Sequence, residues 1–299
     1  MLFRSAGTLQ YGAANAISNS SNVILNGGKF STGATTGYSD TVGTLTLTDN
    51  STIELGTGTH TLNFANSSAV AWTGGKTLTI TGWTNSCSGA KVFVGTDNTG
   101  LTATQLAQIT FQGYAAGASI SPVGELIPGN IVLTATGGTL LAKYDTLKAA
   151  FDAMNLSTHL GVINISVLND INEGANTAAL NQVAGITSVL IQPGGCGPRT
   201  ITGTGTGGSG APLVDLDGAD NVTIDGLNSG SNALTLENTT ASVTSGTSTI
   251  KFIDGATSNT VTRCSVKGGF SAAVTTNGGN IFFSTDGSTA NGNDNNTIS

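Results

Sequence analysis

The chain has 299 residues, of which 43 are glycine, 9% are charged and 5% are aromatic, and its formal net charge is −7. So much glycine argues against long helices, because glycine loses more backbone freedom on folding than any other residue. With only ten lysines and arginines the sequence excludes a nucleic-acid-binding surface, and it contains no apolar stretch of about 18 residues that would insert into a membrane.

The first half of the chain reads as short β-runs separated by Gly, Asn, Asp and Ser. Apolar residues alternate with Thr or Asn in three of these runs, which gives each run one inward and one solvated face. The apolar pairs of these three runs, which begin at Leu45, Leu62 and Leu78, are roughly 16 to 17 residues apart. They predict coils of a parallel β-solenoid stacked on one another, with an antiparallel sandwich as the alternative. The runs are residues 22–25, 43–55, 60–64, 76–83 and 91–94.

The segment 102–109 interrupts this pattern. Thr102 and Gln105 have the spacing of a helix capping box, and a proline-bounded stretch follows. We expect this segment to close a first solenoid unit that covers residues 1–128.

The second unit, residues 129–299, begins with the one amphipathic helix that the sequence indicates. Tyr144, Leu147, Phe151 and Met154 fall on one helical face within residues 144–155. Such a helix would cover the first coil's core and free strand edge, although it could also be an ordinary domain helix.

Short β-runs then continue to the end of the chain with a weak repeat. Asn221, Asn259 and Asn296 recur about 37 to 38 residues apart, each just before an inward-facing Val or Ile. This spacing predicts a ladder of stacked asparagines. Because residue 299 falls inside the repeat, we expect a unit truncated at its C-terminus and covalently continuous with further repeat and export domains.

Several segments resemble known families. Residues 219–227 (ADNVTIDGL), 248–269 (STIKFIDGATSNTVTRCSVKGG) and 144–155 (YDTLKAAFDAMN) resemble β-helix modules of giant secreted proteins of Gram-negative bacteria, within the pectin-lyase-like right-handed β-helix group. Residues 22–33, 43–72 and 91–113 are similar to autotransporter-associated β-strand repeat modules.

These resemblances imply an all-β, right-handed parallel β-helix in two consecutive units. They also imply export to the cell surface, in association with the outer membrane, and a non-catalytic scaffold or adhesin role. Extracellular glycans or a host or matrix surface would be the partners. The alternative is a polysaccharide lyase or glycoside hydrolase, because some members of the group cleave polysaccharides on the same scaffold.

Asp215 and Asp217 are the candidate catalytic pair for that alternative. They alternate with Val214 and Leu216, so both carboxylates would project from one face. Together with Asp220 they form a weak candidate Ca²⁺ site, and no other cofactor is expected. The simpler interpretation is that these aspartates bond their own backbone at turns, and no Lys or Arg stands beside them in the sequence.

The two histidines, His60 and His159, lack the neighbours of a catalytic triad or metal site and are expected at turns or on the surface. Trp72, Trp83 and Tyr114 are the aromatic candidates for stacking on sugars. For each of the three, a role in the core or at its edge is the more favoured interpretation.

Overall fold

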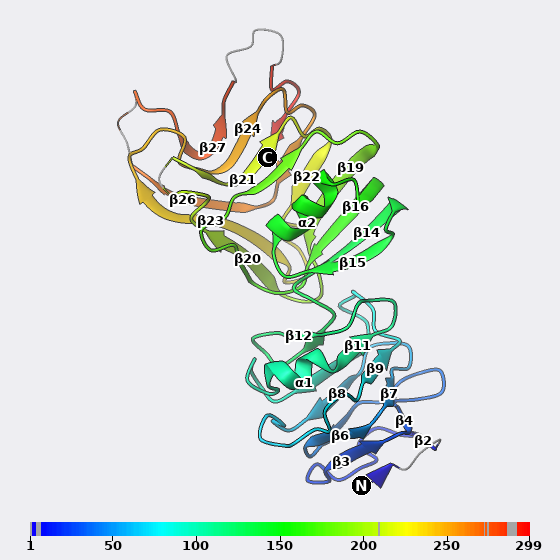
Figure 1. Cartoon of the computed structure of the whole chain (residues 1–299). Coiled ribbons are helices and arrows are strands. Elements are labelled where there is room, and N and C mark those ends of the chain that lie inside the picture. The colour runs from blue at the N-terminus through cyan, green and yellow to red at the C-terminus, as the bar shows by residue number, and fades with distance from the viewer. Residues whose placement is uncertain (1, 4–6, 209, 272, 274, 286–291) are drawn as a thin grey trace. The chain divides into compact units, whose positions relative to one another are not determined.

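The computed structural model describes residues 2–3, 7–208, 210–271, 273, 275–285 and 292–299. These residues are mostly strands, with two helices, so the chain belongs to the all-β class. It divides into two compact units, Met1–Gly129 and Asn130–Ser299 (Figure 1). Neither described helix is long and apolar enough to cross a membrane.

Unit 1 is built from three parallel sheets, and the chain passes through all three in order only between β3 and β8. Sheet 1a has the order β1-β3-β6, sheet 1b the order β2-β4-β7-β9-β11 and sheet 1c the order β5-β8-β10, and an antiparallel pair, β12-β13, follows them. Parallel pairing within the three sheets excludes the antiparallel sandwich. The strands are β1 (Leu2–Phe3), β2 (Thr8–Gln10), β3 (Val23–Asn26), β4 (Lys29–Ser31), β5 (Asp40–Val42), β6 (Leu45–Asp49), β7 (Ser51–Glu54), β8 (Thr61–Phe64), β9 (Leu78–Thr81), β10 (Lys91–Val94), β11 (Ile109–Phe111), β12 (Ser119–Ile120) and β13 (Leu126–Ile127).

Strands that lie 16 to 17 residues apart in the sequence are not stacked on one another. Leu45 pairs with Val23 in sheet 1a, whereas Leu62 pairs with Val92 in sheet 1c. One passage through all three sheets is here termed a circuit. Because a circuit contains several strands with the same alternating pattern, such strands recur along the sequence at shorter intervals than circuits do. The prediction of stacked runs at that spacing was therefore wrong.

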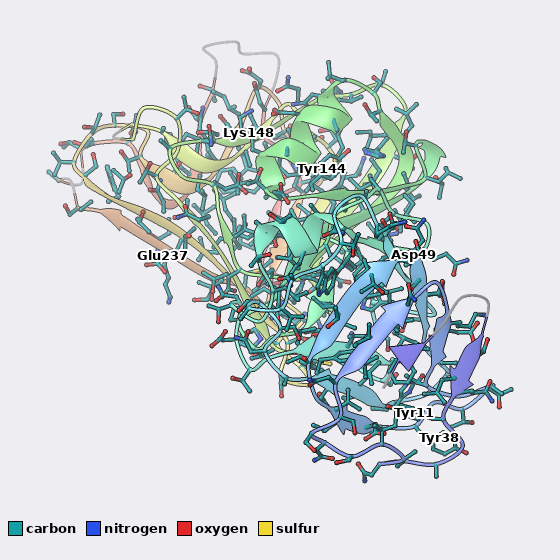
Figure 2. The ribbon with its side chains drawn as sticks, turned by 60° about the horizontal axis from the view of Figure 1, so that its bottom comes forward. Tyr11, Tyr38, Asp49, Tyr144, Lys148 and Glu237 are labelled. Atoms are coloured by element: carbon teal, nitrogen blue, oxygen red, sulfur yellow. The ribbon has the colours of Figure 1, made fainter. Side chains whose placement is uncertain are left out.

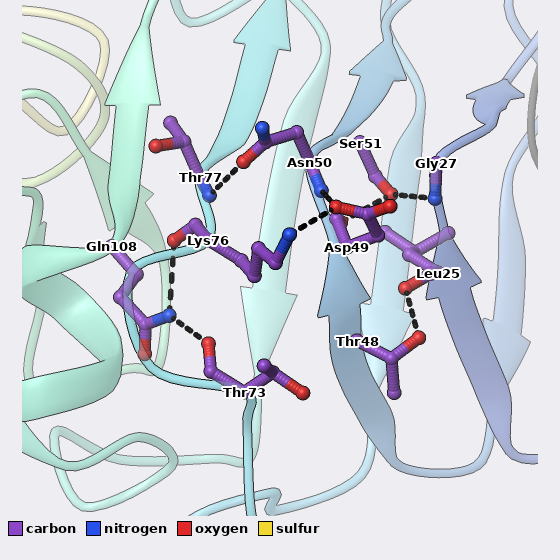
Figure 3. Close-up of polar contacts among 10 residues, drawn as sticks. All are labelled: Leu25, Gly27, Thr48, Asp49, Asn50, Ser51, Thr73, Lys76, Thr77 and Gln108. Carbon is purple, nitrogen blue, oxygen red and sulfur yellow. Dashed lines mark hydrogen bonds and ion pairs between the residues drawn. The ribbon is translucent and has the colours of Figure 1, made fainter.

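Side chains tie successive circuits of unit 1 to one another (Figure 3). Ser51 Oγ accepts a hydrogen bond from the Gly27 backbone N–H at 3.0 Å, and Asn50 Oδ1 accepts one from the Thr77 N–H at 2.8 Å. Lys76 forms an ion pair with Asp49 at 2.7 Å. Helix α1 (Ala103–Ala107) has the predicted capping box, with Thr102 and Gln105 each bonded to the other's backbone N–H.

Unit 2 repeats one order of three sheets more regularly. The chain passes from sheet 2a to 2b to 2c in every circuit, and each strand from β16 to β25 pairs in parallel with its counterpart in the next circuit. Sheet 2a contains β14 (Ile131–Gly138), β15 (Leu141–Tyr144), β16 (His159–Val167), β19 (Ile186–Pro193), β22 (Val222–Asp225), β25 (Thr260–Thr262) and β28 (Thr297–Ile298). Sheet 2b contains β17 (Ile171–Asn172), β20 (Pro198–Gly203), β23 (Ala233–Ser242) and β26 (Ser265–Phe270), and sheet 2c contains β18 (Ala178–Asn181), β21 (Pro212–Asp217), β24 (Ser248–Ile253) and β27 (Gly279–Phe283).

The core of unit 2 is a set of apolar columns running through the circuits. Leu216 and Phe252 are register neighbours and both are fully buried, and Phe283 of the next circuit stacks on Phe252 at 4.5 Å between ring centroids. Each fully buried side chain of this size contributes about 2 to 3 kcal/mol of hydrophobic stabilisation.

Helix α2 (Leu147–Asn155) begins later than the sequence pattern indicated. Thr146 caps it by accepting a hydrogen bond from the Ala149 N–H, and Leu147, Phe151 and Met154 form its buried face. Tyr144 instead belongs to β15, because the antiparallel strands β14 and β15 extend sheet 2a beyond β16. In Figure 2, Tyr144 and Lys148 mark this part of unit 2. This hairpin was not predicted from the sequence.

The asparagine ladder is present for two of its three predicted members. Asn259 Oδ1 accepts a hydrogen bond from the Val222 N–H at 2.8 Å, and Asn296 Oδ1 accepts one from the Asn259 N–H at 2.9 Å. Their amide groups donate to Ala219 and Ala256 carbonyls. Asn221 lies one residue out of register, with an exposed side chain, so including it was wrong.

A buried carboxylate holds the start of helix α2. Glu173 is 1% exposed, and its two oxygens accept hydrogen bonds from the backbone N–H groups of Leu147 at 2.6 Å and Lys148 at 3.2 Å. Desolvation raises the pKa of Glu173, and the two backbone hydrogen bonds oppose that rise. A helix N-terminus favours a negative group at this position.

Replacing Glu173 with alanine is expected to lower the free energy of unfolding by about 2 to 3 kcal/mol, because one buried and one partly buried N–H group lose their acceptors. Urea unfolding followed by circular dichroism measures this loss. The matched control is Asp152→Ala on the same helix, which removes only an exposed ion pair with Lys148 and should cost about 0.5 kcal/mol or less. Equal losses in the two variants would contradict the assigned role of Glu173.

Candidate functional site

The carboxylates of Asp215 and Asp217 lie on the outer face of β21, alternating with buried Val214 and Leu216. The next circuit brings a cation to them. Lys251 of β24 is the register partner of Asp215, and its Nζ lies 3.4 Å from Asp215 Oδ2. The Asp215 side chain is 15% exposed and the Lys251 side chain 18% exposed, so the pair is largely withdrawn from water.

Lys251 and Asp254 also belong to this cluster and were not predicted from the sequence. The signal was present in the repeat, because VDLD (214–217) and IKFI (250–253) occupy the same positions in consecutive circuits. Aligning the two segments would have placed Lys251 directly beside Asp215. Residues far apart in the sequence are neighbours wherever circuits stack.

Burial raises the pKa of both aspartates. Desolvation raises the pKa of Asp215, and the attraction of Lys251 opposes that rise. Desolvation, the hydrogen bond to Asp254 and the charges of Asp215 and Asp254 together raise the pKa of Asp217 to about 6. Asp215 Oδ1 has no hydrogen-bond partner among the described residues.

This arrangement can hold one proton and one negative charge side by side. Below about pH 6, Asp217 is a carboxylic acid that can donate a proton, while an adjacent carboxylate can accept one. Paired carboxyl groups with separated roles are the chemistry that glycoside cleavage needs.

Asp220 accepts hydrogen bonds at a neighbouring turn, and Asp225 belongs to a separate ion pair. Asp220 Oδ1 accepts hydrogen bonds from the backbone N–H and the hydroxyl of Thr257 at 2.8 and 2.7 Å. Asp225 pairs with Arg263 at 2.5 Å. Within the described part of the chain, no group of three or more His, Cys, Asp or Glu side chains is placed to hold a metal ion.

Comparison with known proteins adds nothing to this geometry. No family model, curated protein or solved structure matches the chain.

The two histidines are core residues, contrary to the expectation from the sequence. His60 is 3% exposed and His159 is 0% exposed. His60 Nε2 is 2.8 Å from the Thr32 hydroxyl, and His159 Nε2 is 2.6 Å from the Tyr144 hydroxyl. Both rings have hydrogen-bond partners on each nitrogen, which explains how a polar ring is tolerated in the core.

The aromatic candidates for sugar stacking support the core of unit 1. Trp72 and Trp83 pack against it, and Trp72 Nε1 donates a hydrogen bond to the Leu45 carbonyl. Trp83 makes edge contacts with Phe111 and Tyr114 at 5.6 and 6.1 Å between centroids. The role at the edge of the core is confirmed for all three candidates, since Tyr114 is also packed there.

The raised pKa of Asp217 gives a pH-dependent prediction. The pKa of Asp217 in the folded protein is about 6, above its ordinary 3.8. The contribution of Asp217 to the free energy of unfolding is therefore complete below pH 3.8 and is lost as the pH rises through 6. We expect Asp217→Asn to stabilise the protein by about 1 kcal/mol above pH 7 and to have little effect near pH 4. This gain is well below the full linkage value, because the side chain is partly exposed and screened.

Thermal unfolding across this pH range measures the difference between Asp217→Asn and the wild type. The matched control is Asp294→Asn, which removes an exposed carboxylate elsewhere in unit 2 and should show no such pH trend. A constant difference between Asp217→Asn and the wild type at all pH values would rule out the shifted carboxyl group.

Proposed function

We propose that each unit is a right-handed parallel β-helix. Support comes from the fixed order of three parallel sheets in every circuit of unit 2 and from the apolar columns that run through them. The right hand is the general preference for connections between parallel strands. Helix α2 and the β14–β15 hairpin would close the first circuit of unit 2.

We further propose that the chain is a non-catalytic, extracellular scaffold or adhesin-like module of a larger secreted bacterial protein, associated with the outer membrane. The observation that supports this most strongly is the continuous pairing of each circuit with the next through backbone ladders, reinforced by side chains such as Asn259 and Asn296. Such pairing gives a stiff spacer that leaves few backbone groups open to proteases.

Surface display tests this proposal. The chain is inserted between an outer-membrane anchor and an epitope tag on non-adherent bacteria, and tag labelling and attachment to glycan-coated or matrix-coated surfaces are measured on intact cells. The proposal predicts a labelled, protease-resistant chain and increased attachment. Rapid proteolysis of the displayed chain would contradict the scaffold role, and intact display without attachment would contradict the adhesin role. An Asn259→Ala chain serves as the weakened control.

The second candidate is a polysaccharide lyase or glycoside hydrolase of the pectin-lyase-like type. It is favoured by the ion pair between Asp215 and Lys251 and by the raised pKa of Asp217, which supply a base, a cation and an acid on one face. The two candidates differ in one observable, which is turnover of a polysaccharide.

A further inference from the structure

A hollow lies beside the carboxyl cluster, where the chain turns from sheet 2c to sheet 2a. It is lined by the end of β18, the connection that follows it and the turn at Ala219–Asn221 in the next circuit. The register explains why it exists. Asn181 pairs with Asp217 and Val189 pairs with Val222, so residues 182–188 must span the same gap as the shorter segment 218–221. The shorter turn leaves part of the longer connection uncovered.

The size of this hollow fits a small ligand. Its volume is about 410 Å³, within the range of roughly 300 to 1,000 Å³ typical of ligand pockets. Two other hollows, one beside Ser86 and one beside Tyr38, measure about 210 and 230 Å³ and fall below that range.

The lining has an apolar part and a polar part. Leu180, Val189 and Ala219 supply buried apolar surface, while Gln182 and Asp220, from consecutive circuits, supply polar groups. Their side chains meet at a long 3.4 Å contact between Gln182 Nε2 and Asp220 Oδ2. A ligand hydroxyl or amine can replace so weak a bond and bind to both groups, as saccharides do with amide and carboxylate side chains.

Charge restricts the class of saccharide. Among the described residues of the lining Asp220 is the only charged one, and Asp217 lies just before the lining turn. The neighbouring cluster adds the carboxylates of Asp215 and Asp254, and the ammonium group described within it is that of Lys251. A uronate would therefore meet net negative charge, whereas a protonated amino sugar would be attracted.

We propose that this hollow binds a saccharide unit without negative charge, and binds most tightly one that carries a protonated amine. The inference rests on the proposed adhesin-like function and gives it a site and a ligand class. It also separates this surface from one suited to acidic plant polysaccharides, whose repeating carboxylates this cluster would repel.

Calorimetric titration of the full chain tests the proposal with three probes: a glucosamine oligomer, a neutral cello-oligosaccharide and a galacturonate oligomer. The pH is kept mildly acidic so that the amine is protonated. We expect affinity to fall in that order, with the amino sugar about tenfold tighter than the neutral sugar and no measurable binding of the uronate. Tighter binding of the uronate, or no binding of any probe, would overturn the proposal.

Two variants locate the binding. Ala184→Trp places a large side chain from an exposed position in the lining and should weaken binding of the amino sugar at least about tenfold, whereas Ala115→Trp, at an exposed position in unit 1, should leave it unchanged. Asp220→Asn should weaken the amino sugar more than the neutral sugar. Unchanged binding in Ala184→Trp would place the ligand elsewhere and refute the site.

Surface display and proteolysis are read separately, so failure of this site leaves the scaffold function independently testable.

Discussion

Replacing Asn259 with alanine is expected to lower the free energy of unfolding of unit 2 by about 3 to 4 kcal/mol. The side chain is fully buried and satisfies the Val222 N–H and the Ala219 carbonyl, both in the preceding circuit. Alanine leaves both groups buried without partners, and each such group costs about 1 to 3 kcal/mol. Hydrogen exchange of peptides from β22 and β25, measured by mass spectrometry, reports the loss.

Asn296→Ala is the matched control for this prediction. Asn296 makes the same two kinds of contact one circuit later, to the Asn259 N–H and the Ala256 carbonyl, but it is only partly buried. Water can replace its hydrogen bonds, so a loss about half as large is expected. If Asn259→Ala costs less than about 1 kcal/mol, the ladder does not stabilise the stack.

Replacing Gly37 with alanine is expected to destabilise unit 1 by about 3 kcal/mol or more. A Cβ atom at this position would lie 1.9 Å from Cε1 of His60, far inside van der Waals contact. The ring cannot move aside freely, because the Thr32 hydroxyl and the Gly58 carbonyl hold its two nitrogens at 2.8 and 3.0 Å. Overpacking against a fixed buried group carries costs of this size. Tryptophan fluorescence during urea unfolding is the measurement, since Trp72 and Trp83 both lie in unit 1.

A double-mutant cycle isolates the cause. In a His60→Ala background the clash is absent, so adding Gly37→Ala should cost less than about 1 kcal/mol. Gly12→Ala is the control within unit 1, because nothing lies within 4 Å of a Cβ there, and it should be close to neutral. Additive losses in the cycle would show that the His60 ring is not what excludes a side chain at Gly37.

Local features of the fold could be predicted from the sequence where one segment determines them. The alternation around Leu45 and Leu78, the capping box at Thr102 and most of the buried face of α2 depend on nearby residues and are present. The circuit length in unit 1 could not be read in the same way. Strands in three different sheets share one alternating pattern, so the sequence does not mark which of them stack.

The same limit explains what was missed at the candidate site. Asp215 and Asp217 could be placed on one outer face, because alternation alone fixes it. Lys251 and Asp254 join them only through the pairing of β21 with β24, and their effect on the pKa of Asp217 depends on that pairing. The buried histidines were misjudged for a related reason, since their partners Thr32 and Tyr144 lie 28 and 15 residues away.

The measurement that tests the proposed non-catalytic role most directly is turnover. The purified chain is incubated with acidic, neutral and amino polysaccharides, with and without Ca²⁺, beside the double variant Asp215→Asn, Asp217→Asn and the variant Lys251→Met. New reducing ends report hydrolysis, and ultraviolet absorbance of unsaturated sugars reports elimination. We predict no product from any substrate in the wild type or the variants. Product formed by the wild type and abolished in the double variant would contradict the scaffold role and establish an enzyme built on Asp215 and Asp217. Loss of product in Lys251→Met as well would add Lys251 to its site.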